Sequence, residues 1–220
     1  IMQELKIIKM KEISQFTLPD DLFCMMVNKI NIAYEEKISH SHGLAGNIVQ
    51  EYLMTAKFPE FEQFLINCIQ SHKFYEEYLV KKHSGYLRTY KEDTYRLELQ
   101  LVNLWVNFMY KHEFNPIHSH SGLFSFIVFI KVPFMNEELQ KISPGSKSNS
   151  PRAGNLCFLK PSWWQRIEEV WYAVDATWEK EILLFPAELQ HLVYPFYGTD
   201  EPRITVSGNL AFAKVDNPDL

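Results

Sequence analysis

Hydrophobic positions in the first ninety residues recur at the spacing of amphipathic helices. A first helix is indicated by the apolar positions Leu22, Phe23, Met26, Val27 and Ile30, which fall on one helical face. Thr17 is its candidate N-cap, with Pro19 in the first turn. A second helical pattern starts at Pro59 and runs to Gly85, an expected C-terminal stop. Residues 1–90 are therefore expected to be mainly helical.

From residue 95 the pattern changes to that of strands. Residues 95–109 are apolar on both faces, and residues 123–132 are aromatic and β-branched, as in strands of a barrel or sandwich. Further strands are expected at 155–160, 167–174, 181–185, 192–196 and 203–212, with a Pro/Gly/Ser-rich loop at 143–154. Helices followed by many short strands predict an α+β fold, with the helices packed outside an antiparallel double sheet.

Composition narrows the class of protein. A chain of 220 residues suits a single domain over residues 1–220, in which 1–90 support a core formed by 91–220. The net charge of -5 offers no field for duplex nucleic acid or an anionic membrane. There is no apolar run of membrane-spanning length, and the first residues lack the apolar region of a signal peptide. Cys24, Cys68 and Cys157 are interpreted as buried thiols of a reducing compartment. These features predict a globular cytoplasmic protein without a membrane partner.

Two histidines precede the strand at 123–132. His118 and His120 are two residues apart, so in extended chain both side chains point to the same side of a sheet and can reach one metal ion. The alternative is a turn with two solvent-facing histidines. His40 and His42 have the same spacing, but the segment after them (LAGNIVQEYLM) is interpreted as helix. They are expected in a loop or helix cap, with a substrate lid as the alternative.

Two later segments could complete a site. His191 begins an apolar strand, and a third imidazole across a barrel mouth would complete a three-ligand metal site with open positions. Arg203 and Thr205 share one face of the strand at 203–212. A guanidinium at this position can bind both oxygens of a carboxylate. The alternatives are a rim histidine bonded to the backbone and the outer polar face of a strand.

Two stretches carry a resemblance to a known family. WVNFMYKHEFNPIHSHSGLFSFIVFIKVP (105–133) and EILLFPAELQHLVYPFYGTDEPRITVSGNL (181–210) resemble the 2-oxoglutarate/Fe(II)-dependent oxygenase superfamily. More narrowly, they resemble oxygenases of phages and marine bacteria that are related to prolyl 4-hydroxylases. The resemblance implies a double-stranded β-helix (a cupin-like jelly roll) with N-terminal helices against its outer sheet. It also implies a dioxygenase that hydroxylates an unidentified substrate, a peptidyl or prolyl side chain among the candidates, while 2-oxoglutarate is decarboxylated to succinate and CO2. A phage origin would place the protein in the host cytoplasm.

The resemblance also assigns residues. It implies that His118 and His191 bind Fe(II), and that Arg203 with Thr205 binds the distal carboxylate of 2-oxoglutarate, the co-substrate. His120 stands where the superfamily usually has Asp or Glu, so the chain would have a three-histidine site with one less negative charge. Asn107 is a candidate to hydrogen-bond the co-substrate; the alternative is a structural amide. Lys131 is a second candidate anchor for the carboxylate, or else a solvated lysine.

The residues leave other interpretations open. In a second register, Gly122 would take the carboxylate position after His120, as in halogenase relatives. A three-histidine site also suits a zinc hydrolase or a cupin-like dioxygenase, and a jelly roll can be a non-catalytic binding module. These motifs determine neither the substrate nor the oligomeric state.

Overall fold

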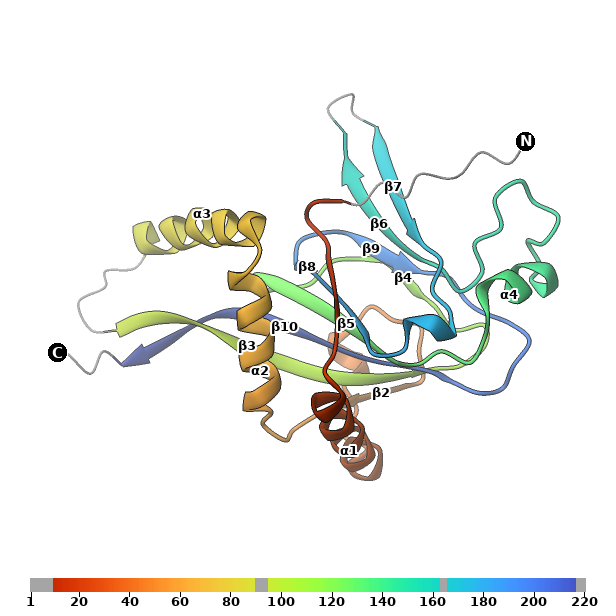
Figure 1. Cartoon of the computed structure of the whole chain (residues 1–220), viewed down its shortest axis with the longest axis horizontal. Helices are drawn as coiled ribbons and strands as arrows, with labels where there is room; N and C mark the ends of the chain where they lie inside the picture. Colours follow the sequence, from red (N-terminus) through yellow and green to blue (C-terminus); the bar gives the residue numbers. More distant parts are fainter. Residues whose placement is uncertain (1–9, 90–94, 163–165, 217–220) are drawn as a thin grey trace.

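The computed structural model describes residues 10–89, 95–162 and 166–216, which form helices and two antiparallel sheets (Figure 1). In chain order the elements are β1 (Ser14–Thr17), α1 (Asp20–Glu36), β2 (Gln50–Leu53), α2 (Pro59–Gln70), α3 (Lys73–Thr89), β3 (Tyr95–Met109), β4 (Asn115–His118), β5 (Phe124–Lys131), α4 (Asn136–Ile142), β6 (Leu156–Pro161), β7 (Ile167–Tyr172), β8 (Glu181–Pro186), β9 (His191–Val193) and β10 (Arg203–Asp216). Each strand expected from the sequence is present, although β9 is shorter and β10 longer than expected. The prediction of helices combined with antiparallel sheets is confirmed.

The strands are shared between a six-stranded and a four-stranded sheet. The larger sheet has the order β1-β8-β5-β10-β3-β2, and the smaller has the order β4-β9-β6-β7. All neighbouring strands are antiparallel. Between β3 and β10 the chain passes repeatedly from one sheet to the other. The two strands that carry His118 and His191 are consequently neighbours in the smaller sheet, although they lie far apart in sequence.

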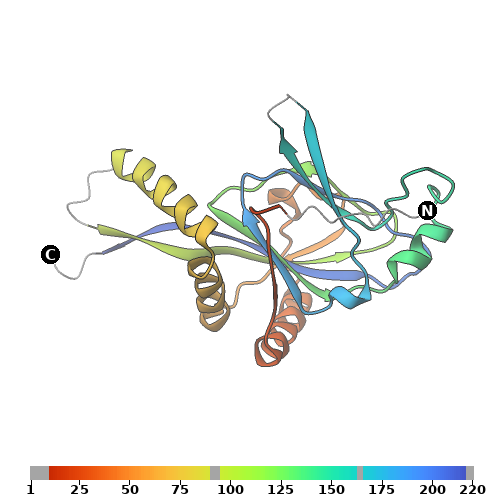
Figure 2. The same ribbon diagram turned by 45° about the horizontal axis from the view of Figure 1, so that its top comes forward.

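Two hydrophobic clusters cover opposite faces of the larger sheet. One cluster joins the sheet to the helices, with Met26 of α1 and Phe61 of α2 on the same side as Leu184 of β8. The other lies on the face toward the smaller sheet and includes Phe158 of β6 and the neighbouring β8 residue Leu183. Alternate residues of β8 are therefore buried in different clusters, which explains why this strand is apolar on both faces. Figure 2 shows α1 and α2 against the larger sheet.

The helical predictions need correction at their ends. Thr17 is not the N-cap of α1, because it lies in β1, where its Oγ1 donates to Glu181 at 2.8 Å, and Pro19 takes the cap position. The second helical pattern is not one helix, because α2 ends at Gln70 and α3 begins at Lys73. Nor does Gly85 end α3, which continues to Thr89. The spacing of apolar residues does not reveal the break between α2 and α3, since both helices keep an apolar face.

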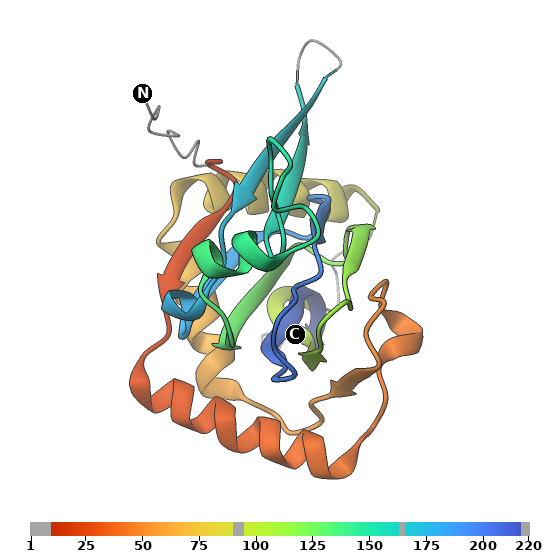
Figure 3. The ribbon, with the colours of Figure 1, turned by 90° about the vertical axis from the view of Figure 1, so that its right-hand side faces the viewer.

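The segment after His42 is a strand and loop, and its interpretation as a helix was wrong. Residues 50–53 form β2, which pairs with β3 at the edge of the larger sheet. Further bridges join Ser39 to Tyr52 and Asn47 to Phe114. Figure 3 shows this orange segment beside the strands of the green part of the chain. Edge pairing with β3 satisfies the backbone groups that a helix would have satisfied internally. The N-terminal part thus supplies two strands, β1 and β2, in addition to its helices.

The cysteine prediction is confirmed only in part. All three cysteines are free, and Cys68 and Cys157 are buried, but Cys24 is exposed on α1. Within the described ranges, no helix combines the length and apolar character needed to span a membrane.

Gly208 is expected to be costly to replace, because backbone lies close to it on the neighbouring strand. A Cβ at this position of β10 would lie 2.4 Å from the backbone oxygen of Asn103 and 2.6 Å from Cζ of Phe126, its cross-strand partner. Backbone oxygen cannot move aside without breaking the pairing with β3, so Gly208→Ala should lower the free energy of unfolding by about 3 kcal/mol. Urea unfolding measures this change. Gly145→Ala is the control, because its nearest atom is the Ser148 hydroxyl at 4.0 Å; equal stability of the two variants would contradict the prediction.

Candidate metal centre

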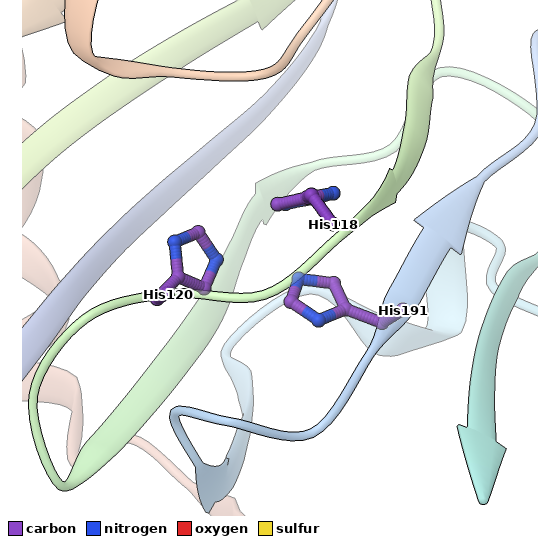
Figure 4. Close-up of side chains that lie close together, drawn as sticks. All are labelled: His118, His120 and His191. Carbon is purple, nitrogen blue, oxygen red and sulfur yellow. The ribbon is translucent and has the colours of Figure 1, made fainter.

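Three histidines converge at the ends of two paired strands. His118 ends β4, His120 follows it in the loop, and His191 begins β9. One ligand nitrogen from each ring lies within 4.8 Å of the others. The ring centroids of His118 and His191 are 4.3 Å apart, and those of His120 are 4.9 Å and 5.1 Å from them. Figure 4 shows the three rings turned toward a common space. The structure brings together the histidines that the sequence singled out.

The backbone fixes the positions of all three histidines. His118 and His191 are direct partners in the β4–β9 pairing. The amide of His120 donates to the carbonyl of Ala187 at 2.8 Å, which ties the loop to the turn before β9. Gly122 closes the loop with φ +104, a conformation that side chains rarely adopt. This backbone requirement explains Gly122, and His118 lies within the cluster, so the geometry supports the register with three histidines.

Two of the rings are oriented by backbone carbonyls. Nδ1 of His118 lies 2.7 Å from the carbonyl oxygen of Pro116, and Nδ1 of His191 lies 3.0 Å from that of Leu189. A carbonyl only accepts hydrogen bonds, so both Nδ1 atoms carry the proton. The proton-free Nε2 atoms are then available to a metal, the arrangement in which a second hydrogen bond sets the tautomer of a metal-binding histidine.

Burial keeps the three imidazoles neutral. Desolvation lowers the pKa of His191 well below its usual value, and the neighbouring His118 and His120 lower it further. Desolvation together with His118 lowers the pKa of His120 to about 4. The pKa of His118 is also lowered by burial, against the hydrogen bond to Pro116. Neutral imidazole is the form that binds metal, so at neutral pH the site needs no deprotonation before metal enters.

The metal-free protein should lose stability as the pH falls from about 6.5 to about 4. In this window the unfolded chain takes up protons on these histidines while the folded chain does not, so stability is present above the unfolded pKa and is lost below it. The expected slope from His120 is about 1.4 kcal/mol per pH unit. Chemical denaturation across this range measures it, and His120→Gln should flatten the curve. An unchanged slope in that variant would show that His120 does not carry the effect.

The three histidines line a cavity of about 160 Å³ that also contains Arg203, Thr205 and Asn107. Arg203 is 4% exposed, and among the described residues its guanidinium donates to the carbonyl of Gly154 at 2.9 Å and to Sδ of Met109 at 2.7 Å. Burial lowers its pKa to about 10. Arg203 appears in none of the ion pairs found within the described residues. The cavity therefore contains a buried cation that lacks an anionic partner.

Asn107 and Thr205 belong to one row of side chains across the larger sheet. Thr205 of β10 is the cross-strand partner of Asn107 in β3, and Nδ2 of Asn107 donates to Oγ1 of Thr205 at 3.3 Å. Lys131, the second candidate anchor, is not part of the cavity lining. It forms an ion pair with Glu201 at the surface, which agrees with its alternative interpretation as a solvated lysine.

Sequence reasoning missed one wall of the cavity. Residues 43–46 and Glu51 line it, although they lie far upstream of both motifs. His40 stands behind this wall, with its ring 5.6 Å from that of Trp105, which in turn lies 5.7 Å from the ring of His120. A local signal is the pair of glycines, Gly43 and Gly46, which let the backbone approach closely.

Comparison with known proteins agrees with the motifs. Residues 103–209 match the family described as "Putative 2OG-Fe(II) oxygenase". A Pseudomonas putida prolyl-4-hydroxylase is similar in structure, with a TM-score of 0.49 and 14% identity over 91% of this chain and 92% of that one. A 2OG-Fe(II) oxygenase family oxidoreductase from Burkholderia pseudomallei has a TM-score of 0.37 and 14% identity, over 53% of this chain and 46% of that one. A search of curated proteins found no match. The segment that matches this family, residues 103–209, makes up just under half of the chain and contains the three histidines, Asn107, Arg203 and Thr205.

Proposed function

We propose that the protein is a 2-oxoglutarate- and Fe(II)-dependent dioxygenase that hydroxylates an as yet unidentified substrate. The observation that carries this proposal is the buried, unpaired Arg203 in the same cavity as the three histidines. A metal site alone would suit many reactions. A metal site beside a cation that lacks a partner specifically suits a co-substrate that chelates a metal at one end and ends in a carboxylate at the other.

His118, His120 and His191 would hold Fe(II) through their nitrogen atoms. Three neutral imidazoles from one side leave open positions for other ligands, as in the non-haem iron sites with a facial set of ligands. The absence of a carboxylate ligand leaves the full positive charge of the metal to be balanced by the co-substrate, a dianion. Bound iron would supply the activation of O2 that couples decarboxylation of 2-oxoglutarate to substrate hydroxylation.

Arg203, Thr205 and Asn107 would position 2-oxoglutarate. The guanidinium has unused N–H groups and can bind both oxygens of the distal carboxylate, which would also offset the cost of burying this cation. Thr205 lies two residues along the same face of β10 and offers its hydroxyl. Asn107 stands next to it and donates its Nδ2 to this hydroxyl at 3.3 Å, which would leave the hydroxyl proton to point at the carboxylate. The cavity is smaller than the roughly 300–1,000 Å³ of drug-sized ligand sites, which suits a small co-substrate.

The fold belongs to the same proposal. Strands β3 to β10 would form a double-stranded β-helix, supported by the order β8-β5-β10-β3 in one sheet and β4-β9-β6-β7 in the other. Residues 1–90 would support this core in a single domain, because β1 and β2 extend the larger sheet and α1 and α2 cover it. In such a β-helix the histidine strands and the Arg203 strand would lie at the same end of the barrel, and the shared cavity that residues of β4, β9 and β10 line supports this arrangement.

The buried Arg203 does not fit the other classes of function. A zinc hydrolase or a binding module has no need of a buried arginine beside its metal or ligand site, since an unpaired buried cation is costly. A cupin-like dioxygenase that acts without 2-oxoglutarate also leaves Arg203 without a purpose.

Anaerobic titration of the metal-free protein tests the proposal. Fe(II) followed by 2-oxoglutarate should produce the weak visible charge-transfer band of their complex, and admission of O2 should yield succinate. Binding of Fe(II) without a band on adding 2-oxoglutarate would contradict the proposal and favour another three-histidine chemistry. Binding of neither would favour a scaffold or binding module. Zn(II) serves as the comparison metal, because it should occupy the site without producing the band.

A further inference from the structure

The cavity contains a second buried charge, opposite in sign to Arg203. Glu51 of β2 is 2% exposed and lines the same cavity as the three histidines. In the part of the chain that the structure describes, its Oε2 has no hydrogen-bond partner. The ion pairs formed by described residues do not include Glu51. A buried carboxylate is costly unless it is paired, so this position calls for an explanation.

The neighbours of Glu51 also present negative potential to the cavity. Asn107, its cross-strand partner in β3, is 6% exposed, and its Oδ1 likewise receives no hydrogen bond from any described residue. Trp105 lies two residues along β3 on the same face and also lines the cavity. A carboxylate oxygen, an amide oxygen and an indole ring all favour a cationic hydrogen-bond donor. Two unpartnered acceptors side by side indicate a ligand group that brings the missing donors.

We infer that Glu51 and Asn107 form the subsite for a cationic amine of the substrate, an ammonium or a guanidinium group. This inference rests on the proposed function, because it names the class of substrate that the oxygenase would take. Glu51, Asn107 and Thr205 occupy successive strands β2, β3 and β10, in one row across the sheet. The row places the carboxylate about 10 Å from the strand of Arg203, given strands about 4.8 Å apart. The cavity is thus cationic at one end, for the dicarboxylate, and anionic at the other, for the amine.

The space around Glu51 is kept open by glycine. A Cβ at Gly46 would lie 2.7 Å from Oε1 of Glu51 and 2.5 Å from Oδ1 of Asn115. Burial raises the pKa of Glu51 to about 7, against a hydrogen bond from Ser41 that lowers it, with Glu113 raising it further. A cationic ligand would remove this cost of ionisation. A purely structural alternative is that a neutral Glu51 donates to Oδ1 of Asn107, a role that glutamine could fill through its amide.

Matched pairs of probes test the subsite. Nα-acetyl-arginine amide is compared with Nα-acetyl-citrulline amide, and Nα-acetyl-lysine amide is compared with Nα-acetyl-norleucine amide. Each pair differs chiefly in side-chain charge. Calorimetry measures binding to the metal-free protein and to the anaerobic protein loaded with Fe(II) and 2-oxoglutarate. At least one cationic probe should bind the wild type about tenfold to a hundredfold more tightly than its neutral analogue. This difference in affinity is what one hydrogen bond to a charged group contributes. The pair that shows the preference distinguishes guanidinium from ammonium.

Two variants separate charge from structure. Glu51→Gln should abolish the preference for the cationic probe, whereas Glu51→Asp, which keeps the charge, should retain part of it. A preference that survives Glu51→Gln, or a wild type without preference in either pair, would overturn the inference; the wild-type comparison decides even if Glu51→Gln does not fold. The charge-transfer band is recorded in the same samples. A wild type without the band contradicts the proposed function, whereas a normal band without charge preference contradicts only the amine subsite.

Discussion

Replacing His191 by alanine is expected to weaken Fe(II) binding by more than about a hundredfold and to abolish formation of the band with 2-oxoglutarate. His191 is 2% exposed and pairs directly with His118, so no solvent-exposed side chain can take its place. Loss of groups that merely orient a ligand already costs about 10–100-fold in metal affinity or activity, and loss of a ligand itself should cost more. Anaerobic metal titration followed by absorption spectroscopy measures the effect.

His42→Ala is the matched control for this experiment. His42 belongs to the other pair of histidines two residues apart, but it is exposed and lies outside the three-histidine group. Its replacement should leave both the stoichiometry of Fe(II) and the band unchanged. Stoichiometric Fe(II) in a folded His191→Ala protein would mean that the metal binds elsewhere, and thermal unfolding establishes whether that variant is folded.

Arg203→Met should separate binding of the co-substrate from stability. Methionine fills similar space without a charge, so the ligand-free variant should be as stable as the wild type or more stable, because a buried cation without a partner is removed. Affinity for 2-oxoglutarate should fall by at least about a hundredfold, since a bidentate contact comprises two charge-assisted hydrogen bonds of about 1.5–3 kcal/mol each. Calorimetry in the presence of Fe(II) under anaerobic conditions measures the affinity.

Thermal and chemical denaturation give the second measurement on Arg203. At a hundredfold excess over its Kd, 2-oxoglutarate should stabilise the Fe(II)-loaded wild type by about 2.7 kcal/mol, and it should not stabilise Arg203→Met. Lys131→Met is the control, because Lys131 lies on the neighbouring strand β5 but pairs with Glu201 at the surface. If both variants retain the stabilisation, Arg203 does not hold the carboxylate. A large loss of stability in ligand-free Arg203→Met would instead give the arginine a structural role through Gly154.

Much of the candidate site could be predicted because its signals are local. His118 and His120 are two residues apart, and so are Arg203 and Thr205, so the alternation of side chains along a strand determines which members share a face. The strands were found for the same reason, since a strand buried on both sides is apolar at every position. These patterns depend on neighbours in sequence and need no knowledge of the packing.

The errors occur where contacts distant in sequence decide the structure. Residues 44–54 have apolar residues at helical spacing, but pairing with the edge of β3 makes residues 50–53 a strand. The break between α2 and α3 likewise follows from packing over the larger sheet, which Tyr75 of α3 joins through its ring contact with Phe124 of β5. Tertiary contacts outweigh propensity in both places, because intrinsic propensities are small beside the burial of an apolar face.

The sequence by itself thus predicted β3 and β5 to β10, and it singled out the three histidines and the arginine, because each of these rests on the local spacing of residue types. Only the tertiary structure decided what surrounds them. Glu51 is one of 27 acidic residues and has no motif, and it becomes a candidate for function only because β2 pairs with β3 and sets it beside Asn107. The register between strands more than fifty residues apart depends on which faces are buried together, which no local pattern specifies. The candidate metal ligands could be predicted from the chain, whereas the wall of the cavity that contains Glu51 was determined by packing.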